Sequence, residues 1–96
     1  MPAYLIGHVN VRDAQRWAQY RNSVPGTLAG WGGALVFRGR LAQTLSGEPL
    51  YAETVVLRFP DLASIDAWHR SAEYQALIPL RQAAADVRLA SYESDD

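Results

Sequence analysis

The sequence contains no cysteine and no lysine. Without cysteine the chain cannot form disulfides, a thiolate nucleophile or a cysteine-ligated metal site. All 9 basic residues are arginine, whose planar guanidinium suits bidentate pairing with carboxylates or phosphates, although a GC-rich genome produces the same bias. The net charge is -1, so we expect neither nucleic acid nor an anionic membrane as a partner.

Long apolar runs are also missing. No stretch approaches the roughly 20 residues that a membrane-spanning helix needs, and residues 1–6 lack the basic region of a signal peptide. We therefore expect a cytoplasmic protein. The 96 residues predict one domain, 1–96, with its core over 3–93 and a frayed acidic tail at 94–96. Because so short a chain buries a small share of its surface, pairing with a second copy would add buried area.

The order of strand and helix signals indicates the fold class. Runs of β-branched and aromatic residues predict strands at 4–11, 34–45, 53–59 and 86–92. Three residues are expected helix N-caps. Asp13 begins a helix that Pro25 should kink or restart, Asp61 begins a second helix, and Ser71 begins a short helix that Pro79 should limit. A turn is expected at 46–49.

This βαββαβ order is that of the ferredoxin-like split fold, in the α+β class. It predicts a four-stranded antiparallel sheet with both helices on one face. The other face of the sheet is then open, and its residues bear on any function.

Side chains alternate across a strand, so each predicted strand divides into two faces. One set is nearly all apolar, includes Leu5, Phe37 and Leu57, and should face the helices. The other set mixes apolar with basic side chains: Tyr4, Ile6, Val36, Val56 and Ala90 with His8, Arg38, Arg58 and Arg88. Such a mixture suits a sheet that packs on a second copy around a wet cavity, which makes a closed barrel with two-fold symmetry. A β-bulge would shift these assignments by one residue.

Several segments together resemble a known family. They are Gly32-Gly33, Val36-Phe37-Arg38-Gly39, Leu57-Arg58-Phe59-Pro60-Asp61, Ala67-Trp68, Ser71-Ala72-Glu73-Tyr74-Gln75 and Leu80-Arg81. The chain is similar, over roughly 4–93, to a domain-of-unknown-function family (number thirteen-thirty) of the dimeric α/β-barrel superfamily. The resemblance implies a ferredoxin-like fold and a sheet-to-sheet homodimer. It implies no established reaction, although the wider superfamily includes cofactor-independent monooxygenases, lactone isomerases and haem-binding enzymes.

Two basic side chains are the candidate catalytic residues. His8 lies on the expected cavity face, where it would transfer a proton, or it is hydrogen-bonded within the dimer contact instead. Arg38 shares that face and would stabilise an anionic intermediate. Arg58 would add charge to the same cavity as a ligand-binding residue. Both arginines have an alternative role, in ion pairs with Glu48, Glu53 or Glu93 across strands or across the dimer.

Other candidate ligand-binding residues lie on the expected helices. Tyr20, Trp68 and Tyr74 have helical spacing and would shape the cavity wall, or they belong to the core. Arg81 would bridge its segment to the sheet or reach the pocket mouth. We expect no metal and no cofactor, because neither histidine lies near an acidic cluster in the sequence and no phosphate-binding loop is present.

Three functions are compatible with these residues. The first hypothesis is a cofactor-independent enzyme, monooxygenase- or isomerase-like, that acts on a small anionic ligand in the barrel cavity. The second is a non-catalytic ligand-binding or sensing dimer with the same pocket. The third is a structural dimer module whose contact face is filled by side chains.

Overall fold

The chain forms one four-stranded sheet with all of its helices on one side, as seen in the computed structural model, which describes residues 1–48 and 51–95. Its elements are β1 (Ala3–Val11), α1 (Ala14–Leu28), the short 3₁₀ helix η1 (Ala29–Trp31), β2 (Ala34–Arg40), β3 (Glu53–Phe59), α2 (Leu62–Arg70), α3 (Ala72–Gln75), α4 (Ile78–Ala84) and β4 (Ala85–Glu93). The strand order is β2-β3-β1-β4, and every neighbouring pair is antiparallel. The predicted α+β, ferredoxin-like arrangement is therefore confirmed.

The helices begin where the capping residues predict. The carboxylate of Asp13 accepts a hydrogen bond from the backbone N–H of Arg16 at 3.1 Å, and that of Asp61 accepts one from Ser64 at 2.8 Å. The hydroxyl of Ser71 accepts one from the N–H of Tyr74. Each of these bonds satisfies a backbone donor that has no partner inside the helix.

Some boundaries differ from the predicted ones. Strand β2 ends at Arg40 rather than at 45, and beyond it one further backbone hydrogen bond, from the N–H of Leu41 to the carbonyl of Ala52, continues the pairing. Helix α4 was not predicted, because Pro79 was expected to end a helix. Pro79 instead lies in the first turn of α4. Proline is well tolerated there, since the N–H that it lacks would have no partner within the helix. Helix α1 runs continuously past Pro25.

The ends of two predicted segments lie outside the described residues. Pro49 of the predicted turn at 46–49 and Asp96 of the predicted frayed tail are the residues concerned. Within the tail, the N–H of Ser94 donates to the carbonyl of Pro2 at 3.1 Å, so this residue is held to the sheet.

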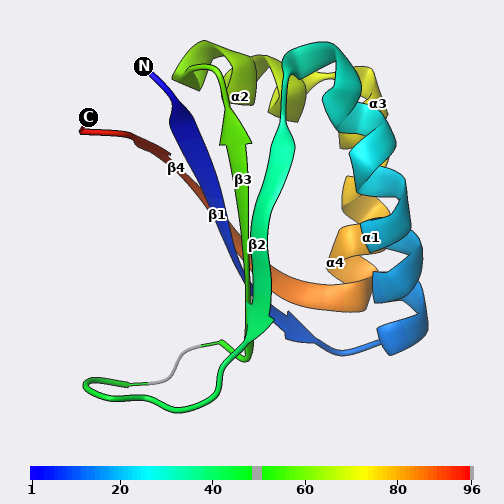
Figure 1. The fold of residues 1–96 in the computed structure, drawn as a ribbon. Helices are drawn as coiled ribbons and strands as arrows, with labels where there is room; N and C mark the ends of the chain where they lie inside the picture. The colour runs from blue at the N-terminus through cyan, green and yellow to red at the C-terminus, as the bar shows by residue number, and fades with distance from the viewer. Residues whose placement is uncertain (49–50, 96) are drawn as a thin grey trace.

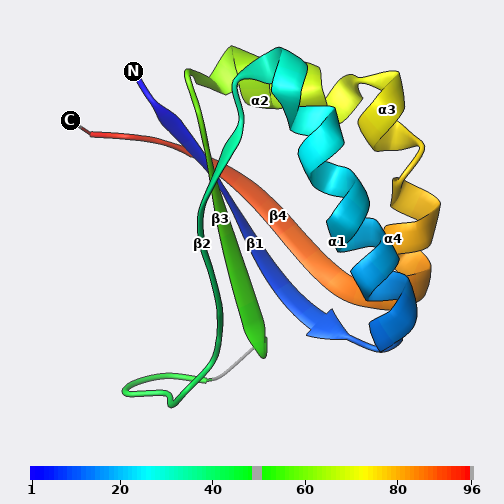
Figure 2. The ribbon, with the colours of Figure 1, turned by 45° about the vertical axis from the view of Figure 1, so that its right-hand side comes forward.

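The core lies between the helices and the sheet. Its buried cluster consists of Ala3, Leu5, Tyr20, Leu28, Leu57, Phe59, Ile65, Trp68 and Tyr74. The opposite face of the sheet carries no helix (Figure 1 and Figure 2). In the part of the chain that the structure describes, no helix is long and apolar enough to cross a membrane.

Candidate functional site

A β-bulge in β2 decides which side chains meet on each face. The pairing of β2 with β3 shifts between Leu35 and Phe37. Beyond the shift, Phe37 lies opposite Val56 and Arg38 lies opposite Val55. Val55 packs against the core, so Arg38 is on the helix side and Phe37 is on the open face. The predicted faces of these two residues were wrong, because the extra residue reverses the alternation.

The bulge places Arg38 at a pocket between α1 and the sheet. This pocket has a volume of about 100 Å³ and is lined mainly by core residues such as Leu57, Val55 and Leu89. An engineered cavity of roughly 150 Å³ holds benzene, so this pocket is smaller than the space one ring needs and would enclose a short branched chain or the edge of a ring whose remainder lies at the opening. Arg38 is exposed and also lines the pocket, which puts it at the opening.

Two arginines supply the charge of this pocket. Arg21 and Arg38 both line it, and neither has an ion pair among the described residues. Partial burial lowers the pKa of Arg38, the nearby positive charge of Arg21 lowers it further, and Glu53 acts in the opposite direction. An anion at the opening would relieve the repulsion between the two guanidiniums.

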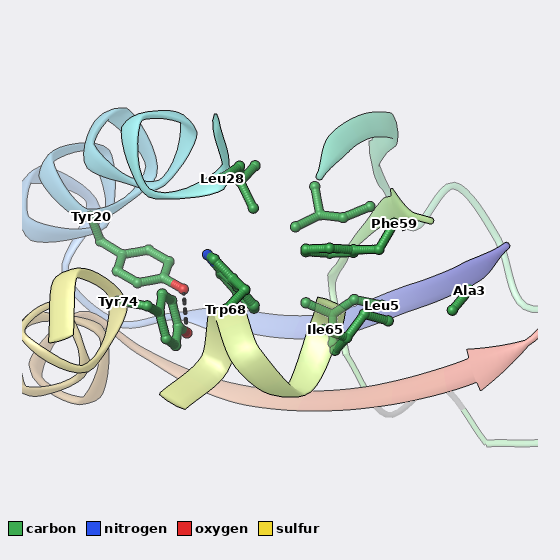
Figure 3. Packing of buried hydrophobic residues seen from close by; sticks show 9 residues of the cluster. Ala3, Leu5, Tyr20, Leu28, Phe59, Ile65, Trp68 and Tyr74 are labelled. Atoms are coloured by element: carbon green, nitrogen blue, oxygen red, sulfur yellow. Dashed lines mark hydrogen bonds between the residues drawn. The ribbon is translucent and has the colours of Figure 1, made fainter. Parts of the chain in front are cut away.

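A chain of hydrogen bonds lies beside the pocket. Nη1 of Arg81 donates to the hydroxyl oxygen of Tyr74 at 2.8 Å, and the hydroxyls of Tyr74 and Tyr20 are 2.8 Å apart. Figure 3 shows the two tyrosines, from α3 and α1, turning their hydroxyls toward each other next to Trp68. Burial raises the pKa of Tyr20, and the neighbouring Tyr74 raises it further. Arg81 acts in the opposite direction, but the net effect is a raised pKa, so the Tyr20 hydroxyl stays protonated and does not act as a base near neutral pH.

Two tryptophans flank the tyrosines. Nε1 of Trp68 donates to the hydroxyl of Thr27 at 2.9 Å, so that donor is satisfied. Trp17 lines the pocket and stacks on Tyr20 at 5.0 Å between ring centroids. Its buried Nε1 has no hydrogen-bond partner among the described residues. A buried donor without an acceptor is costly, so an acceptor supplied by a ligand would stabilise this region.

His8 lies on the other side of the sheet. It is exposed, its Nδ1 shares a hydrogen bond of 3.3 Å with the hydroxyl of Thr54, and its ring stacks at 6.0 Å on Tyr51. The guanidinium of Arg88 lies 5.9 Å from the same tyrosine ring. The prediction that His8 faces away from the helices is confirmed. The prediction that it shares one cavity with Arg38 is wrong, since the two residues lie on opposite faces.

The remaining predicted site residues also divide between the faces. Arg58 is exposed on the open face, opposite Tyr4. It lies four positions along β3 from Thr54, the residue opposite His8, and four strand residues span about 13 Å. Tyr20, Trp68 and Tyr74 are buried on the helix side with Arg81 bonded behind them. The expectation that these aromatics line one cavity together with His8 was therefore wrong. Whether any of these residues binds a ligand stays a prediction.

One pocket residue was missed by the sequence prediction. Arg21 follows Tyr20 and stands four residues after Trp17, on the stripe of α1 that also carries Val24. A charged residue on an apolar helical stripe was the available signal. Among the described residues, no group of three or more histidine, cysteine, aspartate or glutamate side chains could hold a metal ion.

Comparisons with known proteins identify the fold and the family. The family model described as "Domain of unknown function (DUF1330)" matches residues 2–94. No curated protein matches the sequence.

Solved structures match over nearly the whole chain. RPA0582, a protein of unknown function from Rhodopseudomonas palustris, is 21% identical with a TM-score of 0.84, covering 99% of this chain and 83% of that one. A dimeric ferredoxin-like protein of unknown function from Jannaschia sp. CCS1 is 15% identical (TM-score 0.74, covering 98% and 100%). SnoaB, a cofactor-independent oxygenase from Streptomyces nogalater, is 7% identical (TM-score 0.72, covering 99% and 94%). At these identities the likeness concerns the fold alone.

Proposed function

We propose a function from the site itself, since the chain belongs to the DUF1330 family, whose description names no function. The protein is a homodimer. It binds a small organic anion in the helix-side pocket and converts it without a resident cofactor. The observation that carries the proposal is an apolar pocket that opens beside Arg21 and Arg38, two arginines without an ion pair to any residue that the structure describes. A short branched chain or the edge of an apolar ring would fill the pocket, and the anionic group would lie at the opening.

The open sheet face supports the homodimer. Val36, Phe37 and Tyr92 are 55%, 54% and 53% exposed, and Ile6 and Val56 face each other across β1 and β3 on this side of the sheet. Contiguous apolar surface of this kind marks an interface. The similar protein from Jannaschia is described as dimeric. A second copy lying sheet to sheet would cover the face and leave each helix-side pocket within its own protomer.

Ligand binding is tested with benzoate as the probe and benzyl alcohol as its neutral counterpart. Calorimetry should show that benzoate binds more tightly, and that Arg38→Gln weakens binding about tenfold or more, because a hydrogen-bonded charge is lost. Arg58→Gln is the matched control, since Arg58 lies on the opposite face. Equal losses in both variants, or no binding of benzoate, would refute the proposed pocket.

Conversion is tested separately. Compounds that bind are incubated with the protein in air, and products are measured by mass spectrometry. The likeness to a cofactor-independent oxygenase makes oxygenation the first reaction to examine. Turnover that Arg38→Gln abolishes would support the enzyme.

A specific observation favours a second candidate, a non-catalytic binding protein. Among the described residues that line the pocket there is no histidine, aspartate or glutamate. The pocket therefore has no side chain suited to act as a general base. Tight binding without any turnover would support this candidate.

A further inference from the structure

Either hydroxyl can be the donor in the hydrogen bond between Tyr20 and Tyr74, and the burial of the two side chains favours one direction. The hydroxyl oxygen of Tyr74 already accepts a hydrogen bond from Nη1 of Arg81. If Tyr20 also donated to it, the Tyr74 hydrogen would be left without an acceptor in a side chain that is 0% exposed and does not line the pocket. If Tyr74 donates to Tyr20 instead, the unused hydrogen belongs to Tyr20, which does line the pocket. The second arrangement leaves the free hydrogen on the side chain that lines the pocket rather than on the one that is fully buried.

The polar side chains that line the pocket have one common property. Among the described residues, the polar side chains that line the pocket are those of Trp17, Tyr20, Arg21, Arg38 and Trp68. None of them is an amide, a carboxylate or an imidazole. Tryptophan and arginine only donate, and the arrangement above makes Tyr20 a donor as well. A ligand group that must itself donate a hydrogen bond would find no side-chain partner here, whereas an anionic oxygen would.

We propose that Arg81, acting through Tyr74, holds Tyr20 as a hydrogen-bond donor to the pocket, and that the ligand is a phenol or enol bound there as its oxyanion. Arg81 and Tyr74 are positioning residues, because neither lines the pocket. The proposal rests on the proposed function and names the substrate class for that site. Low-dielectric surroundings by themselves disfavour a charged ligand, but they also strengthen its hydrogen bonds to the arginines and the other donors. Binding should favour the ionised form of the ligand because these donors surround its oxygen.

The probe is 4-nitrophenol, whose colour reports its ionisation, compared with 4-nitrotoluene, which has a methyl group in place of the hydroxyl. The protein should bind 4-nitrophenol more tightly and lower its apparent pKa by about one unit or more, a tenfold preference for the anion. This titration needs only the unmodified chain. Tyr20→Phe and Tyr74→Phe should each reduce the shift, and Tyr92→Phe, on the exposed sheet face, should leave it unchanged.

The outcomes separate the two proposals. A shift that disappears in Tyr20→Phe and Tyr74→Phe, with circular dichroism showing intact folds, supports the donor chain. An unshifted pKa, equal binding of both nitro compounds, or binding of benzoate without 4-nitrophenol overturns the inference and leaves the proposed pocket standing. If neither benzoate nor the nitro compounds bind, both proposals are wrong.

Discussion

Replacing Phe37 with aspartate should convert the protein to a monomer. The bulge in β2 turns this side chain onto the open face opposite Val56, and its ring lies so close to Gly39 that a Cβ there would be 2.5 Å from it. Phe37 remains 54% exposed in a single protomer. The substitution therefore takes little from the protomer's own core and acts mainly on the contact with a second copy.

The magnitude follows from the burial that the contact would complete. Fully burying a phenylalanine side chain is worth about 1.5–3 kcal/mol, so covering the exposed half contributes about 1 kcal/mol. A carboxylate at the same place adds at least about 1 kcal/mol, because the arginines of this face, such as Arg58, offset its desolvation only in part. The two-fold contact contains the residue twice, so the dimer should lose about 4 kcal/mol or more, roughly a thousandfold in Kd.

Sedimentation velocity across micromolar concentrations measures this effect. Phe37→Asp should sediment as a monomer near 10.6 kDa. Leu62→Asp, at a site on α2 that is 36% exposed and lies away from this face, should remain dimeric. Thermal unfolding confirms that both variants fold. A dimer of unchanged affinity in Phe37→Asp would refute the sheet-to-sheet contact, and a monomeric unmodified chain would refute the dimer itself.

Three further predictions concern the same architecture. Gly39→Ala should displace the Phe37 ring, because the new Cβ has no room, and should weaken the dimer measurably in the same sedimentation assay. Gly33→Ala should lower the free energy of unfolding by about 1–3 kcal/mol in urea titrations, since its Cβ would lie 2.8 Å from Leu28 and 2.9 Å from Phe59; unchanged stability would show that this core relaxes freely. Hydrogen bonds from the side chain and backbone of Ser64 lower the pKa of Asp61 below its ordinary 3.8. The charged cap therefore stabilises the fold above pH 3.8, and this stabilisation is lost as the pH falls through the lower pKa of the folded state. Asp61→Asn should thus reduce Tm at pH 7, and a difference that persists at pH 2 would contradict this assignment.

Local chemistry in the sequence was enough to predict most of the fold. Alternation in β1 and β3 placed Leu5 and Leu57 against the helices, and their burial agrees. The side chains of Asp13 and Asp61 cap helices as expected, because a cap depends on only three or four consecutive residues. Interactions of this range are readable from one sequence, and together they specify the βαββαβ order and the family resemblance.

The candidate site depended on contacts that no local pattern contains. The bulge that exchanges the faces of Phe37 and Arg38 is a property of how β2 pairs with β3, and nothing within β2 alone reveals it. The chain from Arg81 through Tyr74 to Tyr20 joins three helices, with its two tyrosines 54 positions apart. The elements, their order and the apolar faces of β1 and β3 were predictable because they follow from neighbouring residues. Which charged and hydroxyl groups meet at the pocket depends on strand register and helix packing, because these bring together residues that are distant in the chain.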